Sequence, residues 1–478
     1  MNKKMNKKEK IETRLLISVF SVSLLILCGL LTETAVNIAF PTLMTEFKIN
    51  ATTVQWLTTG KMLVVAMITP LSSFFKKRFK IKNLFLLSGT IFLIGSVIGA
   101  AAINFPMLIF SCVVQGVGIG LVLPLVFNII LEQAPASKIG TVMGIASLVI
   151  AAGPALGPTF GGIVVSFLNW RAIFIIMIPL TLLSLIGGAL TIAQKSETEK
   201  IPLDLLGTLL VMVGFFFLVY GSVNIGSFSE KSGTVIFSFI IGILAILAFI
   251  LFERKCQNPL VQLNIFRNAR FNWHLAAYFS MQITFLGFSF ILSNYLQIVC
   301  GKSSFVTGMC LLPGAIGQAV LSLCGGMILD KYGAKKPIIW GSVLAIIGSG
   351  LFWISGLYMA AAMVVMFYII MEVGLGCTYG NTMTNALKSI SKDYYADGNA
   401  VYNTLSQFAG SFGTSIAAVI LAFSQSGNVN SDYIKNTAQG AHNAFTLFFI
   451  VLICNFAFQV IALYKSAKNK RHKSEVVK

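Results

Sequence analysis

The segment TRLLISVFSVSLLILCGLLTETAVNIAFPTLM (residues 13–44) is an apolar run long enough to cross a lipid bilayer, and it carries one acidic residue, Glu33, in its interior. About 20 apolar residues in a helix span the hydrocarbon layer of a membrane. A lone charge at that depth costs at least about 2.5–3.5 kcal/mol, so it persists only where it faces a partner or a watery cavity. The next apolar run, residues 53–75, carries Lys61 in the same way. Both residues are therefore candidates for a transport pathway.

Apolar runs of this kind recur along the whole chain of 478 residues. Hydrophobic residues make up 56% of the sequence and charged residues only 11%, whereas a soluble protein carries roughly 25% charged residues. The sequence therefore predicts an all-α membrane protein. Fourteen runs are predicted to cross the membrane, near residues 15–44, 53–75, 83–103, 106–131, 139–168, 171–193, 203–223, 233–252, 272–299, 304–328, 336–356, 357–387, 398–424 and 443–464.

The positive charges alternate along the chain with the predicted crossings. Most of the 35 Lys and Arg residues fall on one side, in the two terminal tails and in loops such as residues 76–82, 254–270 and 331–336. This distribution predicts a multi-pass protein of a cytoplasmic membrane with both termini in the cytoplasm. The net charge of +19 thus belongs to loops at the membrane surface, and we expect no nucleic-acid partner.

The longest polar connections, residues 194–202 and 253–272, flank the seventh and eighth runs. They predict six helices, two inserted helices and six further helices. The similar segments QGVGIG and MEVGLG in the fourth and twelfth runs indicate related halves, an organisation common in secondary transporters. The predicted parts are a basic cytoplasmic tail (1–14), a six-helix bundle (15–193), a linker with two extra helices (194–271), a second six-helix bundle (272–464) and a second basic tail (465–478).

The loop GGMILDKYGAKK (residues 325–336) forms a short turn between two predicted helices. Gly326 and Gly333 permit a tight backbone, Asp330 is expected to cap the following helix, and the Lys residues suit an anionic inner leaflet. The loop resembles a signature of the major facilitator superfamily, although the corresponding loop of the first half lacks the Asp. The alternative is a basic loop that only sets the topology.

A second motif, GPALGPTFGG (residues 153–162), combines Gly and Pro residues that kink a helix and let a neighbouring helix approach closely. It resembles the antiporter motif of exporters in the same superfamily. A kink without directional meaning is the alternative. The residues assigned to the two conformational motifs are Gly153, Pro154, Gly157, Pro158, Gly161, Gly162, Gly326, Asp330 and Gly333.

Further segments, among them TETAVNIAFP, QWLTTGKMLV and FLNWRAIFIIMIP, are similar to those of the fourteen-helix drug:H+ antiporters, especially the lincomycin-resistance type of bacterial multidrug exporter. The resemblance implies the major facilitator fold, amphipathic small-molecule substrates and efflux driven by a proton gradient, without a cofactor. No GxxxxGK[ST] loop for ATP occurs in the sequence. The sequence departs from the family by having Cys112 where relatives have Arg, and Lys61 where many have an aromatic residue.

Three charged residues are candidates for proton coupling. Glu33 is predicted to carry the proton, and the alternative is a fixed structural pair with Lys61. Lys61 either substitutes for the missing Arg or extends its amine toward the membrane surface. Glu372, in the twelfth run, is either a second proton site or a binder of cationic drugs, and the alternative is a packed Glu hydrogen-bonded to Tyr or Asn.

Residues of the central helices are candidates for a substrate cavity, with hydrogen bonding between helices as the alternative for the polar ones. They are Asn37, Gln115, Trp56, Phe127 and Asn128, with Gln282, Asn294, Gln297 and Gln318 as further polar groups. Glu132, in contrast, is expected to lie at an interface.

The sequence leaves rival functions open. A dedicated exporter of one endogenous metabolite, lipid or peptide would use the same fold and proton site. A sensor or scaffold that has lost transport is a second alternative, suggested by the missing Arg. The eight Cys residues form no CxxC pair and the three His residues are scattered, so neither a metal site nor an enzyme is expected. We expect the protein to act as a monomer.

Overall fold

The protein is described by a computed structural model that covers residues 11–476 except 50, 55, 195–196, 199–203, 226–227, 257–258 and 426–432. Within these ranges the chain forms helices and no strand. The first half contains α1 (Thr13–Ile38), α2 (Phe40–Phe47), α3 (Ala51–Val54), α4 (Trp56–Ile68), η1 (Thr69–Leu71), α5 (Ser72–Arg78), α6 (Ile81–Ala100), α7 (Phe105–Gln133), α8 (Ile139–Phe167) and α9 (Arg171–Thr191).

The rest of the chain continues the series of long helices. It contains α10 (Leu205–Asn224), α11 (Phe228–Glu253), η3 (Leu263–Arg267), α12 (Ala269–Asn294), η4 (Tyr295–Val299), α13 (Ser304–Tyr332), α14 (Lys335–Ile354), α15 (Ala361–Leu387), η5 (Lys392–Tyr394), α16 (Tyr395–Gln425) and α17 (Tyr433–Val476).

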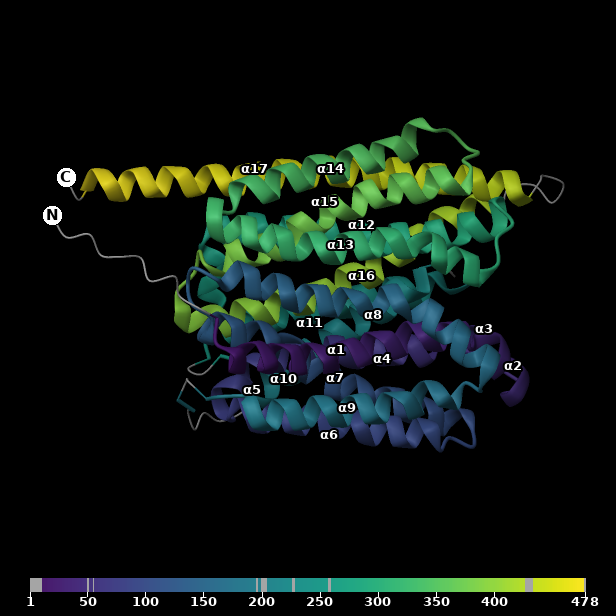
Figure 1. Ribbon diagram of the computed structural model, residues 1–478, viewed down its shortest axis with the longest axis horizontal. Helices are drawn as coiled ribbons and strands as arrows, with labels where there is room; N and C mark the ends of the chain where they lie inside the picture. The colour runs from purple at the N-terminus through teal and green to yellow at the C-terminus, as the bar shows by residue number, and fades with distance from the viewer. Residues whose placement is uncertain are drawn as a thin grey trace.

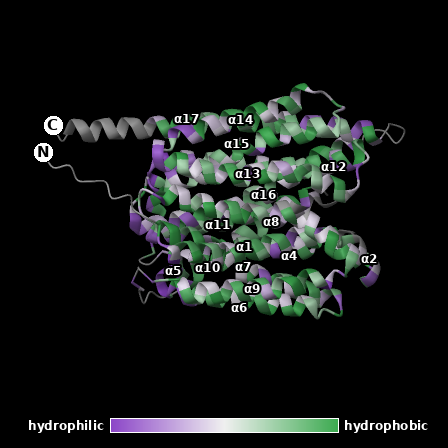
Figure 2. Ribbon diagram, in the orientation of Figure 1, coloured by the Kyte–Doolittle hydropathy of each residue, from purple (hydrophilic) through white to green (hydrophobic). Residues whose placement is uncertain are grey.

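The long helices lie side by side and are apolar along their middle sections, with polar residues gathered at both ends (Figure 2). Thirteen segments in the described part of the chain are long and apolar enough to cross a membrane. Helix α8 adds a fourteenth crossing if its two parts, which meet at 44°, form one span. The predicted all-α membrane fold with about fourteen crossings is therefore confirmed.

The helices form two bundles of six. Helices α1, α4, α6, α7, α8 and α9 pack on one another, and so do α12 to α17. The extra hairpin, α10 and α11, packs through α10 on α4 of the first bundle and α16 of the second. Helix α1 begins and helix α17 ends at the same side of the molecule (Figure 1), which we call the terminus side.

Local sequence explains the helix limits. The Asn104 side chain accepts a hydrogen bond from the Met107 amide and caps α7. Helix α13 ends at Gly333, whose φ of 81° suits a residue without a side chain. The second crossing is interrupted at Pro70, in η1, because proline cannot donate the amide hydrogen bond of an α-helix. The last helix continues to Val476, beyond the crossing predicted to end near residue 464.

Candidate transport pathway and bundle interface

Lys61 is buried in the first bundle, with 1% of its surface exposed. Its Nζ donates a 2.7 Å hydrogen bond to the Gly29 carbonyl oxygen of α1 and lies 6.0 Å from the centre of the Phe92 ring. Glu33 lies one turn further along α1 and is half-buried. The two charges interact through space. The ion pairs found at described residues do not include one between them, so the structure does not show the fixed contact of the alternative interpretation.

Two predicted cavity residues near Glu33 are exposed. Asn37 is one turn beyond Glu33 and accepts a 2.6 Å hydrogen bond from the Thr58 hydroxyl of α4. Trp56 is 37% exposed, and its ring centre lies 5.9 Å from that of Tyr220 in the extra hairpin. Phe127, in contrast, is half-buried and packs against the main hydrophobic core. An acid, an amide and an aromatic ring on α1 and α4 are therefore at least partly exposed in this structure.

Two other predicted cavity residues lie elsewhere. Gln115 is fully buried inside the first bundle, where its Nε2 donates a 3.0 Å hydrogen bond to the Ser96 hydroxyl. Asn128 is 2% exposed and accepts a hydrogen bond from Asn399 of the second bundle. In this structure both side chains are buried and hydrogen-bonded to a neighbouring helix. Their assignment to a substrate cavity stays a prediction.

Glu372 is fully buried in α15. It interacts with Tyr368, one turn earlier, although neither of its carboxylate oxygens reaches hydrogen-bond geometry with a described residue. A buried carboxylate without hydrogen bonds is unfavourable in its charged form.

The second bundle carries a half-buried polar group that the sequence did not single out. The Tyr379 hydroxyl of α15 donates a 2.5 Å hydrogen bond to the Gln282 side chain of α12 and lies 3.2 Å from the Ser406 hydroxyl of α16. The Tyr278 and Tyr379 rings contact each other in a tilted arrangement, with centres 4.4 Å apart. Gln282 was a candidate on the basis of its polarity, but nothing in the sequence places Tyr379 and Ser406 beside it.

The Gly-rich motif of α8 faces α1. Added Cβ atoms at Gly153 and Gly161 would come within 2.8 Å of Leu30 and Ala35, and one at Gly157 would overlap the Thr34 side chain. Pro154 is half-buried at the bend of α8, whereas the side chain of Pro158 lies outside the described residues. At the opposite end of the motif, Gly162 faces Phe305 of α13. The motif thus brings α8 against the segment of α1 that carries Glu33.

Asp330 joins the two bundles on the terminus side. Its carboxylate accepts hydrogen bonds from the amides of Gly140 and Thr141, at 2.8 and 2.7 Å, and from the Thr141 hydroxyl, at 2.7 Å. These amides are the free donors at the start of α8. Gly326 and Gly140 lie against each other, since a Cβ on Gly326 would overlap the Gly140 carbonyl. The expectation that Asp330 caps the next helix is therefore wrong, because it caps a helix of the other bundle.

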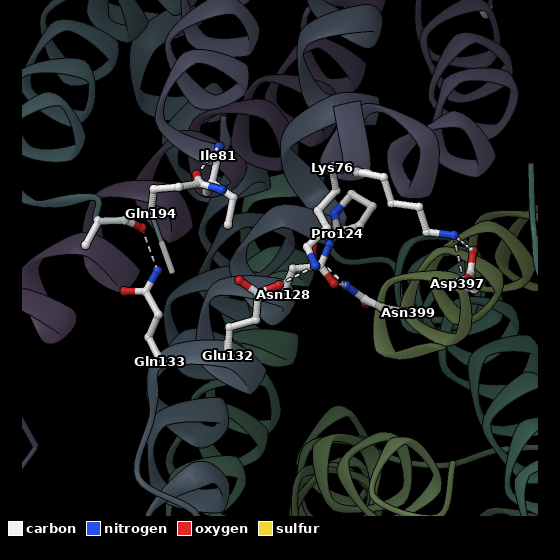
Figure 3. A network of polar contacts seen from close by, with 11 residues as sticks. Lys76, Ile81, Pro124, Asn128, Glu132, Gln133, Gln194, Asp397 and Asn399 are labelled. Atoms are coloured by element: carbon white, nitrogen blue, oxygen red, sulfur yellow. Dashed lines mark hydrogen bonds and ion pairs between the residues drawn. The ribbon is translucent and has the colours of Figure 1, made fainter. Parts of the chain in front are cut away.

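Asp397 forms a second joint between the bundles on the same side (Figure 3). It is fully buried in the first turn of α16. It accepts a 2.5 Å hydrogen bond from the Ser73 hydroxyl, and its carboxylate lies 3.2 Å from Lys77 Nζ, with both partners on α5. Nearby, Asn399 donates hydrogen bonds to the Pro124 carbonyl, at 2.6 Å, and to Asn128, at 2.8 Å.

Glu132 was expected at an interface near the end of its helix. It lies one residue before the end of α7 and forms an ion pair with Lys76 of α5, within the first bundle. Asp397, Asn399 and Ser73 were not among the residues predicted from the sequence. A usable signal was present, because the DGN tripeptide (residues 397–399) introduces an acid and an amide at the start of a helix that is otherwise rich in small residues.

Comparison with known proteins identifies the family to which this helical architecture belongs. The sequence profile of the Major Facilitator Superfamily matches residues 22–414. The chain belongs to the major facilitator superfamily. It is 35% identical over 415 residues to the lincomycin resistance protein LmrB of Bacillus subtilis (strain 168), covering 86% of each chain. It is 28% identical to a multidrug resistance protein B homolog of Mycobacterium tuberculosis (strain ATCC 25618 / H37Rv), covering 82% of this chain and 73% of the relative.

A solved structure supports the superfamily fold. The human organic anion transporter MFSD10 (TETRAN) superposes with a TM-score of 0.67 at 14% identity, covering 93% of this chain and 99% of that structure. At this identity the match concerns the fold alone. The protein is therefore a multi-pass membrane transporter of the major facilitator superfamily, as the sequence resemblance implied.

Proposed function

We propose that this transporter exports amphipathic drugs in exchange for protons by alternating access. The observation that carries the proposal is the position of Glu33, a half-buried carboxylate on α1 that interacts with the charge of the buried Lys61. A carboxyl group in this setting changes its proton affinity when its solvation or its distance from a cation changes. The names of the relatives, lincomycin resistance protein and multidrug resistance protein B homolog, support a drug as substrate.

In our proposal the structure represents one of the two end states of such a cycle. Three groups of hydrogen bonds, centred on Asp330, Asp397 and Asn399, join the bundles, and all lie on the terminus side. Asn37 and Trp56, toward the other side, are exposed. The positive-inside distribution of Lys and Arg supports a cytoplasmic terminus side. In our proposal this state is therefore closed to the cytoplasm and gives Glu33 access to external protons.

The packing of α8 on α1 connects the proton to the conformational change. A protonated Glu33 loses its attraction to Lys61, while the Gly motif of α8 keeps the backbone of α1 within close reach. We propose that α1 then shifts along α8 and biases the bundles toward the state open to the cytoplasm. Glu33 and Asn37 would contact substrate from the first bundle, and Tyr379 and Gln282 from the second. Glu372 remains a proposed second proton site.

Efflux from cells that express the protein tests the role of Glu33. A panel of fluorescent and antibiotic substrates is measured with and without a protonophore. Glu33→Gln should abolish gradient-driven efflux, because the amide cannot exchange a proton, while substrate binding to the purified protein remains detectable. Glu12→Gln, an exposed carboxylate just before α1, is the matched control and should transport normally. Active efflux by Glu33→Gln at the control rate would remove Glu33 from the mechanism, and transport of a single metabolite would favour a dedicated exporter.

The role of Lys61 is tested by removing its positive charge and then introducing a positive charge on a neighbouring helix. Lys61→Ala should impair proton coupling, because Glu33 then loses the cation that favours its ionised form. Cys112 is buried on the neighbouring helix α7 and interacts electrostatically with Lys61. Adding Cys112→Arg should therefore restore part of the proton-driven efflux. If the double variant is no better than Lys61→Ala, Lys61 does not replace the Arg of relatives, and wild-type efflux by Lys61→Ala would exclude it from coupling.

A further inference from the structure

An apolar cavity of about 150 Å³ lies between the extra hairpin and both bundles. Pro70 contributes its wall from the first bundle, Phe215 and Phe249 from the hairpin, and Ala400 and Thr404 from α16 of the second bundle. A cavity of this size with an apolar lining stays dry and takes up an apolar guest. The cavity is therefore unsuited to water and suited to hydrocarbon.

The cavity lies at the terminus-side end of the membrane layer. Phe249 and Ile250, in its wall, are within two turns of the end of α11, and Phe266, which is 38% exposed, belongs to the connection before α12. The outward face of α11 is apolar as well, with Leu247 50% exposed and Leu251 62% exposed. Hydrocarbon chains of the adjacent leaflet therefore lie directly beside this hairpin.

Three cationic side chains are close in sequence to residues that line the end of the cavity. Arg254 and Lys255 follow α11 one turn after Ile250, Arg267 follows Phe266, and all three are exposed. The carboxylates of two neighbouring acidic residues accept hydrogen bonds from backbone amides. Asp204 accepts a 2.9 Å hydrogen bond from the Gly207 amide, and Glu253 accepts bonds of 3.0 and 3.1 Å from the Leu260 amide. The exposed charged side chains Arg254, Lys255 and Arg267 are positive and complement an anionic headgroup.

We propose that this cavity binds a segment of one acyl chain of an anionic membrane phospholipid, with the phosphate held at Arg254, Lys255 and Arg267. The walls connect the site to the bundle interface. Pro70 is three residues from Ser73, and Ala400 is three residues from Asp397. Separation of Ser73 from Asp397 moves two walls of the cavity apart, so the lipid binds the closed arrangement and stabilises it.

Native mass spectrometry of the purified full-length protein tests this site independently of transport. Phosphatidylglycerol and phosphatidylcholine with identical acyl chains are added, and the retained lipid is counted. Wild type should retain phosphatidylglycerol preferentially. Val401→Phe and Ala400→Phe fill the cavity and should lose the retained lipid, whereas Leu247→Phe, the same type of enlargement on the outer face of α11, should keep it.

The rim is tested with charge removal. Replacing Arg254, Lys255 and Arg267 by Gln should reduce phosphatidylglycerol affinity by roughly fivefold for each charge removed. The matched control replaces Lys331, Lys335 and Lys336 by Gln and should leave the affinity unchanged, because these residues lie at the end of α13 and the start of α14, on the same side but outside the cavity lining. Equal retention of the two lipids by wild type, undiminished retention by both cavity-filling variants, or equal losses in the rim and control variants would overturn the proposal. Thermal unfolding without lipid identifies any variant that is misfolded.

Discussion

Asp330 and Asp397 both join the two bundles on the terminus side, but they do so through different kinds of contact. Both place a carboxylate at the N-terminus of a helix, where free amides and the helix dipole favour negative charge. Asp330 reaches α8 from the opposite bundle, so its contact with the helix end is itself the bridge. Asp397 belongs to the helix that it stabilises, so its bridge needs separate partners, Ser73 and Lys77. The two acidic contacts between the bundles therefore use different partners, although each carboxylate lies at the start of a helix.

The difference has an energetic consequence. Asp330 is half-buried and its partners are neutral backbone and hydroxyl groups. Asp397 is fully buried, and Lys77 is its cationic partner, with 23% of its side chain exposed. Removing the cation from a buried pair leaves an uncompensated charge, whereas removing a half-buried cap exposes donors that water can reach. Loss of the contact should therefore shift the conformational equilibrium more at Asp397 than at Asp330.

The largest effect is expected for Lys77→Met. Asp397 would then be buried without its cation, at a cost on the order of 3–5 kcal/mol that separation of the bundles relieves by hydration. The conformational equilibrium should shift toward the state open on the terminus side by roughly two to four orders of magnitude. Pulsed EPR distances between spin labels on α5 and α16, in a background with the native Cys replaced by Ser, measure this shift.

Lys76→Met is the matched control, since the neighbouring Lys76 pairs with Glu132 inside the first bundle and does not bridge. The charge-reversed variant Lys77→Asp with Asp397→Lys should recover part of the closed population. A distance distribution for Lys77→Met that matches the Lys76→Met distribution would show that the ion pair does not hold this interface.

A smaller effect is expected for Asp330→Ala. The variant removes a helix cap, which is worth roughly 0.5–2 kcal/mol, and the freed amides of Gly140 and Thr141 can bind water at the end of α8. The same EPR measurement between α8 and α13 should show a several-fold shift, less than that of Lys77→Met. Asp393→Asn, which alters an exposed local contact with Ser391, serves as control. A shift for Asp330→Ala larger than that for Lys77→Met would reverse the proposed order of the two joints.

The predicted crossings were accurate because each depends on a local property. A run of about 20 apolar residues becomes a helix in a membrane, since no other backbone arrangement satisfies its own hydrogen bonds there. The Gly spacing of residues 153–162 likewise specified close packing before its partner was known. Local reasoning could not predict the hydrogen bonds of Gln115 and Asn128, because polarity alone does not distinguish a cavity wall from a contact between helices.

The sequence by itself determined that this chain crosses a membrane about fourteen times, that its positive charges lie mostly on one side, and that charged Glu33 and Lys61 lie within apolar helices. Only the tertiary structure decided which groups meet. Asp330 and Thr141 are 189 residues apart, and Asp397 and Ser73 are 324 apart. Hydropathy is a property of each segment, whereas partners separated by such distances depend on how the two bundles dock, which no local pattern encodes.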